Sequence, residues 1–138
     1  MRPACSRSLL AFVGLVALAA CGGDALSPRN VAGTYTLRTV NGQPLPYRRI
    51  LEATDTIETL ASSFTLAPGG AFTERWTSRV TGRGRVATAS NAIPGTWRLE
   101  GRTVEVLQEG GGGTGGPLTD DYTITVTRDG YGVMVYRK

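Results

Sequence analysis

The chain has 138 residues, a length that fits one domain, and carries 15 Lys and Arg against 11 Asp and Glu. It contains no histidine and two cysteines. These counts exclude His-based acid–base catalysis, Ser-His-Asp triads and ordinary zinc or haem sites. The basic excess is too small and too scattered to indicate a nucleic-acid partner.

The first twenty residues are typical of a targeting segment. Arg2 and Arg7 precede an uncharged run, residues 9–20, which has the length of a secretory hydrophobic region and is too short to span a bilayer as a helix. A buried core helix would need a polar face, which this run lacks. We therefore predict that residues 1–20 are a signal peptide.

The segment Leu18-Ala19-Ala20-Cys21 resembles the lipobox of bacterial lipoproteins, in which a branched apolar residue and two small residues precede a cysteine. The resemblance implies cleavage before Cys21 and a diacylglycerol with palmitate-type chains on its thiol. Cys5 would leave with the signal peptide, so no internal disulfide is expected. An ordinary signal peptide, cut after Ala19, is the alternative.

Residues 21–30 begin with Cys21-Gly22-Gly23-Asp24 and are predicted to form a short, flexible, polar tether. Two or three acyl chains give stable anchoring, so the membrane, reached through lipid on Cys21, is the first expected partner. Gly22 stands where lipoproteins retained at the inner membrane carry aspartate. The resemblance therefore implies a cell-envelope location on the outer membrane, facing the periplasm or the cell surface.

From residue 31 to the C-terminus, apolar and polar residues alternate with period two, and Gly, Pro and Asn separate the segments. This pattern predicts one β-domain over residues 31–138. The predicted strands are residues 31–40, 45–53, 63–67, 71–80, 96–100, 103–107, 122–127 and 131–136. Residues 51–61 fit either a strand or a short helix. Residues 110–116 (GGGGTGG) are predicted as a loop without a fixed conformation.

Roughly eight short strands joined by hairpins predict an all-β fold, a small antiparallel up-and-down barrel, because closure removes exposed sheet edges. A β-sandwich is the alternative. The alternation also predicts which side chains point inward: Tyr35, Leu37, Phe64, Leu66, Phe72, Trp76, Trp97, Leu99, Val104, Val106, Tyr122, Ile124, Val126, Val133 and Val135.

Short motifs in this domain resemble the lipocalin-like lipoproteins of the calycin type. Gly33-Thr34-Tyr35 is similar to the lipocalin Gly-x-Trp motif with Tyr in place of Trp, and residues 39–46 (TVNGQPLP) resemble the stretch that follows it. A second Gly-x-Trp ends at Trp97. The resemblance implies a lipocalin-like barrel in which a terminal basic residue, Arg137, covers Tyr35 as a cation–π pair. A related barrel, such as the META-type envelope domain, is the alternative.

Inward aromatic side chains and one carboxylate are the candidate ligand-binding residues. Glu74 falls between Phe72 and Trp76 on the apolar face, where a carboxylate either pairs with an arginine such as Arg98 or Arg137 or orients a ligand in an apolar cup. Core packing is the competing interpretation for the aromatic residues. The full candidate set is Tyr35, Phe64, Phe72, Glu74, Trp76 and Trp97.

We therefore expect a non-catalytic envelope lipoprotein that binds a small apolar or amphipathic ligand and uses no metal or cofactor. The alternative is a structural or protein-interaction lipoprotein with a solid barrel, whose loops at residues 79–85 and 110–116 contact an envelope protein. A cavity open at one end would favour the first function, and a filled interior with an exposed apolar patch would favour the second.

Overall fold

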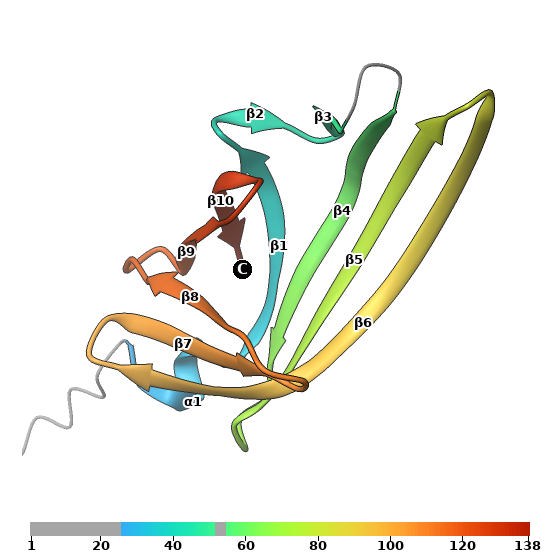
Figure 1. Ribbon diagram of the computed structural model, residues 1–138. Coiled ribbons are helices and arrows are strands. Elements are labelled where there is room, and N and C mark those ends of the chain that lie inside the picture. The colour runs from blue at the N-terminus through green and yellow to red at the C-terminus, as the bar shows by residue number, and fades with distance from the viewer. Residues whose placement is uncertain (1–25, 52–54) are drawn as a thin grey trace, which may run out of the picture.

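The computed structural model describes residues 26–51 and 55–138, which form an antiparallel β-barrel with one short helix (Figure 1). The predicted signal peptide, Cys21 and the first tether residues lie outside the described residues, as do residues 52–54. Within the described part of the chain, no helix has the length and apolar character that crossing a bilayer would require.

Ten strands and one helix follow each other along the described residues. They are α1 (Pro28–Val31), β1 (Gly33–Val40), β2 (Gln43–Pro44), β3 (Tyr47–Ile50), β4 (Thr56–Leu66), β5 (Ala71–Gly82), β6 (Arg85–Glu100), β7 (Thr103–Gln108), β8 (Gly113–Pro117), β9 (Thr123–Arg128) and β10 (Gly132–Arg137). Eight of the strands are neighbours in the order β8-β7-β6-β5-β4-β1-β10-β9, and β2 and β3 pair with β1 and β4.

The sheet closes almost completely on itself. All strand pairs are antiparallel, and a bridge from Leu118, just after β8, to Ile124 in β9 joins the two ends of the strand order. Around the barrel each of the eight strands lies next to the one of the eight that follows it in the chain, and the first strand, β1, also pairs with the last, β10, which closes the circle. The all-β, up-and-down barrel is therefore confirmed, and its architecture is compatible with a lipocalin-like fold.

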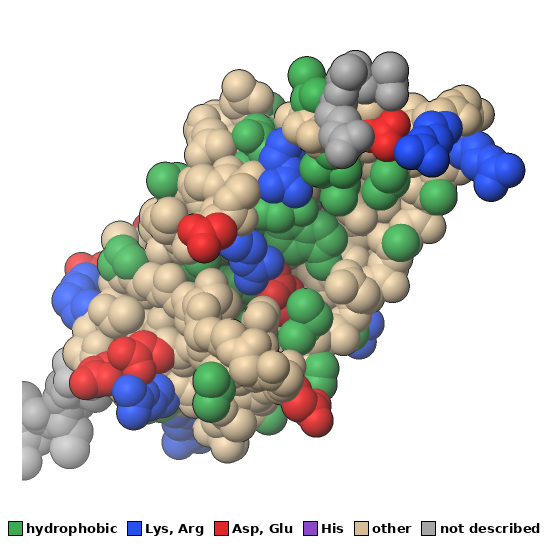
Figure 2. Space-filling model, in the orientation of Figure 1, with side chains coloured by type: hydrophobic (Ala, Val, Ile, Leu, Met, Phe, Trp, Pro, Cys, Tyr) green, Lys and Arg blue, Asp and Glu red, His purple; other side chains and the backbone are tan. Residues whose placement is uncertain are grey.

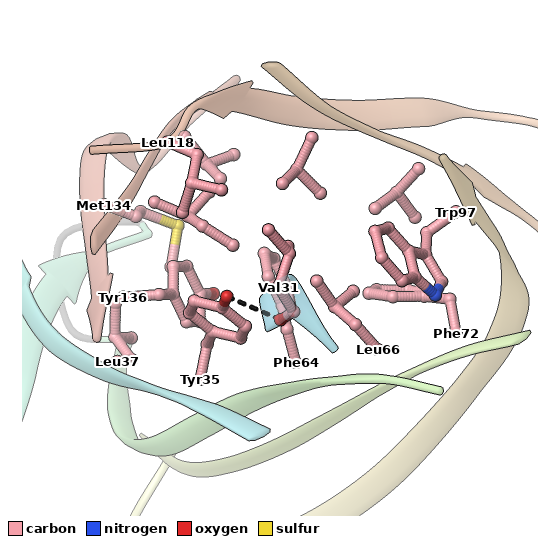
Figure 3. Packing of buried hydrophobic residues seen from close by; sticks show 14 of the residues in the cluster. Val31, Tyr35, Leu37, Phe64, Leu66, Phe72, Trp97, Leu118, Met134 and Tyr136 are labelled. Atoms are coloured by element: carbon pink, nitrogen blue, oxygen red, sulfur yellow. Dashed lines mark hydrogen bonds between the residues drawn. The ribbon is translucent and has the colours of Figure 1, made fainter. Parts of the chain in front are cut away.

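Large aromatic side chains fill the barrel interior (Figure 3). The ring of Phe64 stacks on Tyr136 with 4.0 Å between centroids and meets Phe72 edge-on at 5.3 Å. The Tyr35 hydroxyl donates a hydrogen bond of 2.7 Å to the carbonyl oxygen of Val31. Burial, together with the nearby Tyr122, raises the pKa of Tyr35 to about 12. These contacts produce a solid core.

Helix α1 covers one end of the barrel, which we call the base. Val31, its last residue, is buried in the core, and Leu26 packs against the same cluster. The Lys138 ammonium group donates to the carbonyl oxygens of Asn30 and Ala32, each at 2.7 Å. The structure thus places the last part of the predicted tether, from Leu26 onward, against the folded domain.

The terminal basic residue that reaches the base is Lys138, and the predicted cation–π pair between Arg137 and Tyr35 is wrong. Arg137 follows the inward-facing Tyr136, so it points outward, where it forms an ion pair of 2.8 Å with Asp121. The Lys138 side chain runs past Gly33, whose φ is +145° and where a Cβ atom would lie 2.6 Å from Cε of Lys138. The positive φ favours glycine at position 33, whereas the close contact is with the flexible end of the Lys138 side chain, which can shift.

Strands β4 and β6 are much longer than predicted, β5 is two residues longer, and all three extend beyond the barrel (Figure 1). We call this extension, residues 56–61, 77–82 and 85–94, the wing. Strand β7 pairs with β6 only from Gly95 onward, so no strand in the part of the chain that the structure describes pairs with the wing on that side. Residues 79–85 were predicted as a loop but form strand ends joined by the tight turn Arg83-Gly84, where both φ angles are positive. Of residues 51–61, those from Thr56 onward are strand.

Two further expectations about the C-terminal strands are wrong. Residues 110–116 were predicted as a loop without fixed conformation, but Gly113–Pro117 is strand β8. On β10, Val133 and Val135 were predicted to face inward, whereas Met134 and Tyr136 are buried and Val133 is 43% exposed. In β10 the even-numbered residues Met134 and Tyr136 face the core, one residue away from the predicted positions, and a shift of one residue exchanges the two faces of a strand.

Replacing Gly116 with alanine is expected to lower the free energy of unfolding by about 1–3 kcal/mol, because overpacking forces the backbone to move. A Cβ atom at this position would overlap the backbone carbonyl of Thr125 in β9, where β8 approaches to close the barrel. Gly113→Ala is the control, since its Cβ atom would lie 3.6 Å from the nearest backbone oxygen, that of Val106. Urea unfolding of both variants measures the difference, and equal losses would contradict the prediction.

Candidate ligand-binding site

A cleft of about 420 Å³ opens between the barrel and the inner face of the wing. It lies at the mouth, the end opposite α1, because β9 runs from the base at Thr123 to Arg128 beside the cleft. In Figure 2, hydrophobic side chains gather in the hollow below the wing, with Lys or Arg side chains beside them. The cleft is lined by Ile57, Glu74, Trp76, Ser78, Ala89, Asn91, Ile93, Arg128 and Tyr131.

The register of β5 and β6 explains this lining. Glu74 pairs with Ile93, Trp76 with Asn91 and Ser78 with Ala89, so alternate residues of both strands present their side chains to the same face. The first part of β5 contributes to the barrel and the second part to the wing. Strands β5 and β6 therefore contribute residues to both the floor and one wall of the cleft.

A buried ion pair forms the floor. Glu74 is fully buried, and Arg128 donates to its two carboxylate oxygens at 2.8 and 3.0 Å. The Gln108 amide adds a third hydrogen bond of 2.7 Å. Burial alone would lower the pKa of Arg128, but the hydrogen bonds and negative charge of Glu74 raise it above its usual value. Because Phe64 is directly cross-strand from Glu74, this polar layer separates the filled core from the open cleft.

The prediction that Glu74 faces inward and pairs with an arginine is confirmed, but the partner is Arg128. Arg98 and Arg137 are exposed and pair with Glu105 and Asp121 instead. Arg128 lies 54 residues from Glu74, and barrel closure brings them together. A sequence signal did exist, since Arg128 continues the inward alternation of Ile124 and Val126 along β9.

An aromatic pair stands beside the ion pair. Trp76 and Tyr131 meet edge-to-face with 5.1 Å between ring centroids. The Arg128 guanidinium lies 5.5 Å from the Trp76 ring, and the Arg49 guanidinium lies 4.2 Å from the Tyr131 ring. Arg49 and Tyr131 were not among the predicted site residues. The sequence does not reveal that β3 and the turn before β10 lie next to each other in the fold.

The other predicted aromatic ligands do not line this cleft. Trp97 is almost fully buried, and its indole N–H donates to the carbonyl oxygen of Ala67 at 2.8 Å. It borders a separate hollow on β6 and β7, where the nearby Arg98 and Glu105 neutralise each other. The remaining three, Tyr35, Phe64 and Phe72, belong to the core. Of the six predicted ligand-binding residues, Glu74 and Trp76 line the cleft.

A second carboxylate with two arginine partners, Glu58, lies on the outer face of the wing. Arg48 donates to its Oε1 at 2.7 and 3.0 Å, and Nε of Arg79 donates to Oε2 at 2.6 Å. Hydrogen bonds from Arg48 and then Arg79 hold the pKa of Glu58 below its ordinary value of 4.5. Part of the basic charge around residues 79–85 is therefore neutralised within the protein.

Replacing Glu58 with glutamine is expected to make the free energy of unfolding less sensitive to acid. Because the pKa of Glu58 is lower in the folded protein than its ordinary value of 4.5, the ionised carboxylate stabilises the fold fully at pH values above 4.5. This stabilisation is lost as the pH falls through the pKa of Glu58 in the folded protein. The wild type should thus be more stable than Glu58→Gln at neutral pH, and the difference should shrink below pH 4.5. Denaturant unfolding across this range measures it, with the exposed Glu109→Gln as control.

No family model matches this chain, and no curated protein matches it significantly. The fold and the site together define an antiparallel up-and-down barrel, compatible with a lipocalin-like fold, that carries an open cleft at its mouth. Among the described residues, no three His, Cys, Asp or Glu side chains lie close enough together to hold a metal ion.

Proposed function

We propose that the protein is a non-catalytic, lipid-anchored envelope protein that binds a small amphipathic ligand in the cleft at the barrel mouth. The observation that supports this most directly is a cleft of about 420 Å³ whose walls combine apolar side chains such as Ile57 and Ile93 with the polar Ser78 and Asn91, and whose floor is a hydrogen-bonded carboxylate–guanidinium pair. Small-molecule sites are mostly apolar hollows with a few fixed polar groups. Because aromatic side chains fill the barrel, the ligand is assigned to the cleft and not to the barrel interior.

Anchoring through lipid on Cys21 is the second part of this proposal. It is supported by the likeness of residues 18–21 to a lipobox and by the position of the preceding apolar run. We expect the protein to sediment with outer membranes and to incorporate a palmitate analogue, and Cys21→Ser to lose both properties. A Cys21→Ser protein that still incorporates the analogue would contradict lipidation at this residue.

Native mass spectrometry of the protein purified from its own envelope tests ligand binding. A retained small molecule is expected in the wild type. Ala89→Trp should lose it, because the new side chain fills the cleft. Ala92→Trp is the matched control, since Ala92 lies on the same strand but faces the other side of the sheet. Circular dichroism verifies that both variants fold. Retention by Ala89→Trp, or loss in both variants, would contradict the proposal.

Two observations favour the alternative function, a structural lipoprotein that binds an envelope protein: aromatic side chains fill the barrel interior, and one strand edge is open. The outer edge of β6 from Arg85 to Pro94 has no neighbouring strand among those described, and residues 86–93 carry no charge. Such an edge can accept a strand from another chain. In that case native mass spectrometry would show a co-purifying protein, and Val86→Lys and Thr88→Lys would release it.

A further inference from the structure

We propose that the cleft selects amphipathic anions and that Arg49 binds their head group. This inference rests on the proposed function and specifies its ligand class. Arg49 belongs to β3, where it pairs in register with Ile57, a cleft-lining residue of β4. Its guanidinium lies over the ring of Tyr131, which also lines the cleft. Arg49 is therefore positioned at the rim of the cleft.

The Arg49 guanidinium is held in place, and no carboxylate in residues 26–51 and 55–138 forms an ion pair with it. It donates to the carbonyl oxygen of Gly130 and lies 4.2 Å from the Tyr131 ring centroid. Its Nε atom is buried and has no hydrogen-bond partner among the described residues. Its sequence neighbour Arg48 instead pairs with Glu58. A buried donor without an acceptor is unusual in a folded protein, and an anion near the guanidinium would supply the missing acceptor and charge.

The charges around the cleft favour an anion over a cation. Among the described residues, Glu74 and Arg128 neutralise each other at the floor, and Arg49 adds a positive charge without an ion-pair partner at the rim. The wing beside it contributes apolar side chains, among them Ile57 and Ile93. A head group with carboxylate, sulfate or phosphate oxygens would bind Arg49, while an alkyl chain would lie along the wing toward Trp76.

Isothermal titration of the non-lipidated Cys21→Ser protein with single-chain amphiphiles of equal length tests this inference. The probes are dodecanoate, dodecyl maltoside and dodecyltrimethylammonium, each kept below its critical micelle concentration. Dodecanoate is expected to bind at least about tenfold more tightly than the neutral and cationic probes, which is the size of one charge-assisted interaction. Arg49→Gln should remove this preference and leave weak binding of the neutral probe.

Arg48→Gln is the matched control, because Arg48 is adjacent to Arg49 but lies on the opposite face of the sheet, where it pairs with Glu58. It should leave the preference for dodecanoate unchanged. Equal affinity for all three probes, or an Arg49→Gln protein that keeps the preference, would overturn this inference and leave the proposed cleft function intact. If none of the three amphiphiles binds the folded protein, the proposed function itself fails.

Discussion

Arg128→Ala is expected to lower the free energy of unfolding by about 3–5 kcal/mol, the usual effect of removing one partner of a buried ion pair. Glu74 is fully buried and accepts two hydrogen bonds from Arg128, so the variant leaves a negative charge in the barrel with only Gln108 as a donor. Urea unfolding at neutral pH, monitored by circular dichroism, measures the loss.

Two controls separate this effect from a general loss of charge. Arg102→Ala breaks an exposed pair with Asp120 and should cost less than about 1 kcal/mol. The double variant Glu74→Leu with Arg128→Met replaces both charges by apolar side chains and should recover most of the lost stability. A single Arg128→Ala variant as stable as Arg102→Ala would show that the pair contributes little to the fold.

Phe64→Ala is expected to destabilise the protein by a similar amount, about 3–5 kcal/mol, because it leaves a cavity in the centre of the barrel. Phe64 contacts Tyr136 face-to-face and Phe72 edge-on, and none of the three is more than 1% exposed. The same urea experiment measures the effect. Val133→Ala, at a 43% exposed position on β10, is the control and should change stability by less than about 0.5 kcal/mol.

The strand pattern could be predicted wherever apolar and polar residues alternate strongly. Tyr35 and Leu37 on β1, or Ile124 and Val126 on β9, show this alternation, and all four are buried. The wing part of β6 could not be found in this way, because its Ala, Ser and Thr residues are exposed on both faces and leave no periodic signal. Strand β8 was missed because its glycines serve close backbone approach, which composition alone does not reveal.

The candidate site was only partly predictable for a related reason. Glu74 and Trp76 could be identified because they lie on one strand with a clear inward face. Arg49, Arg128 and Tyr131 reach the cleft through contacts between segments far apart in the sequence, and no local pattern specifies such pairings. Lys138 illustrates the same limit at the base, where a shift of one residue decides which basic side chain points toward α1.

The position of α1 at the base has a consequence for how a lipidated molecule would be oriented. Only five peptide bonds separate Cys21 from Leu26, which packs at the base, and a stretch of that length spans at most about 18 Å. A lipid on Cys21 would therefore keep the base near the bilayer and direct the mouth and wing toward the aqueous compartment. The cleft would then exchange its ligand with molecules dissolved in that compartment, and not by lateral diffusion from the leaflet that holds the anchor.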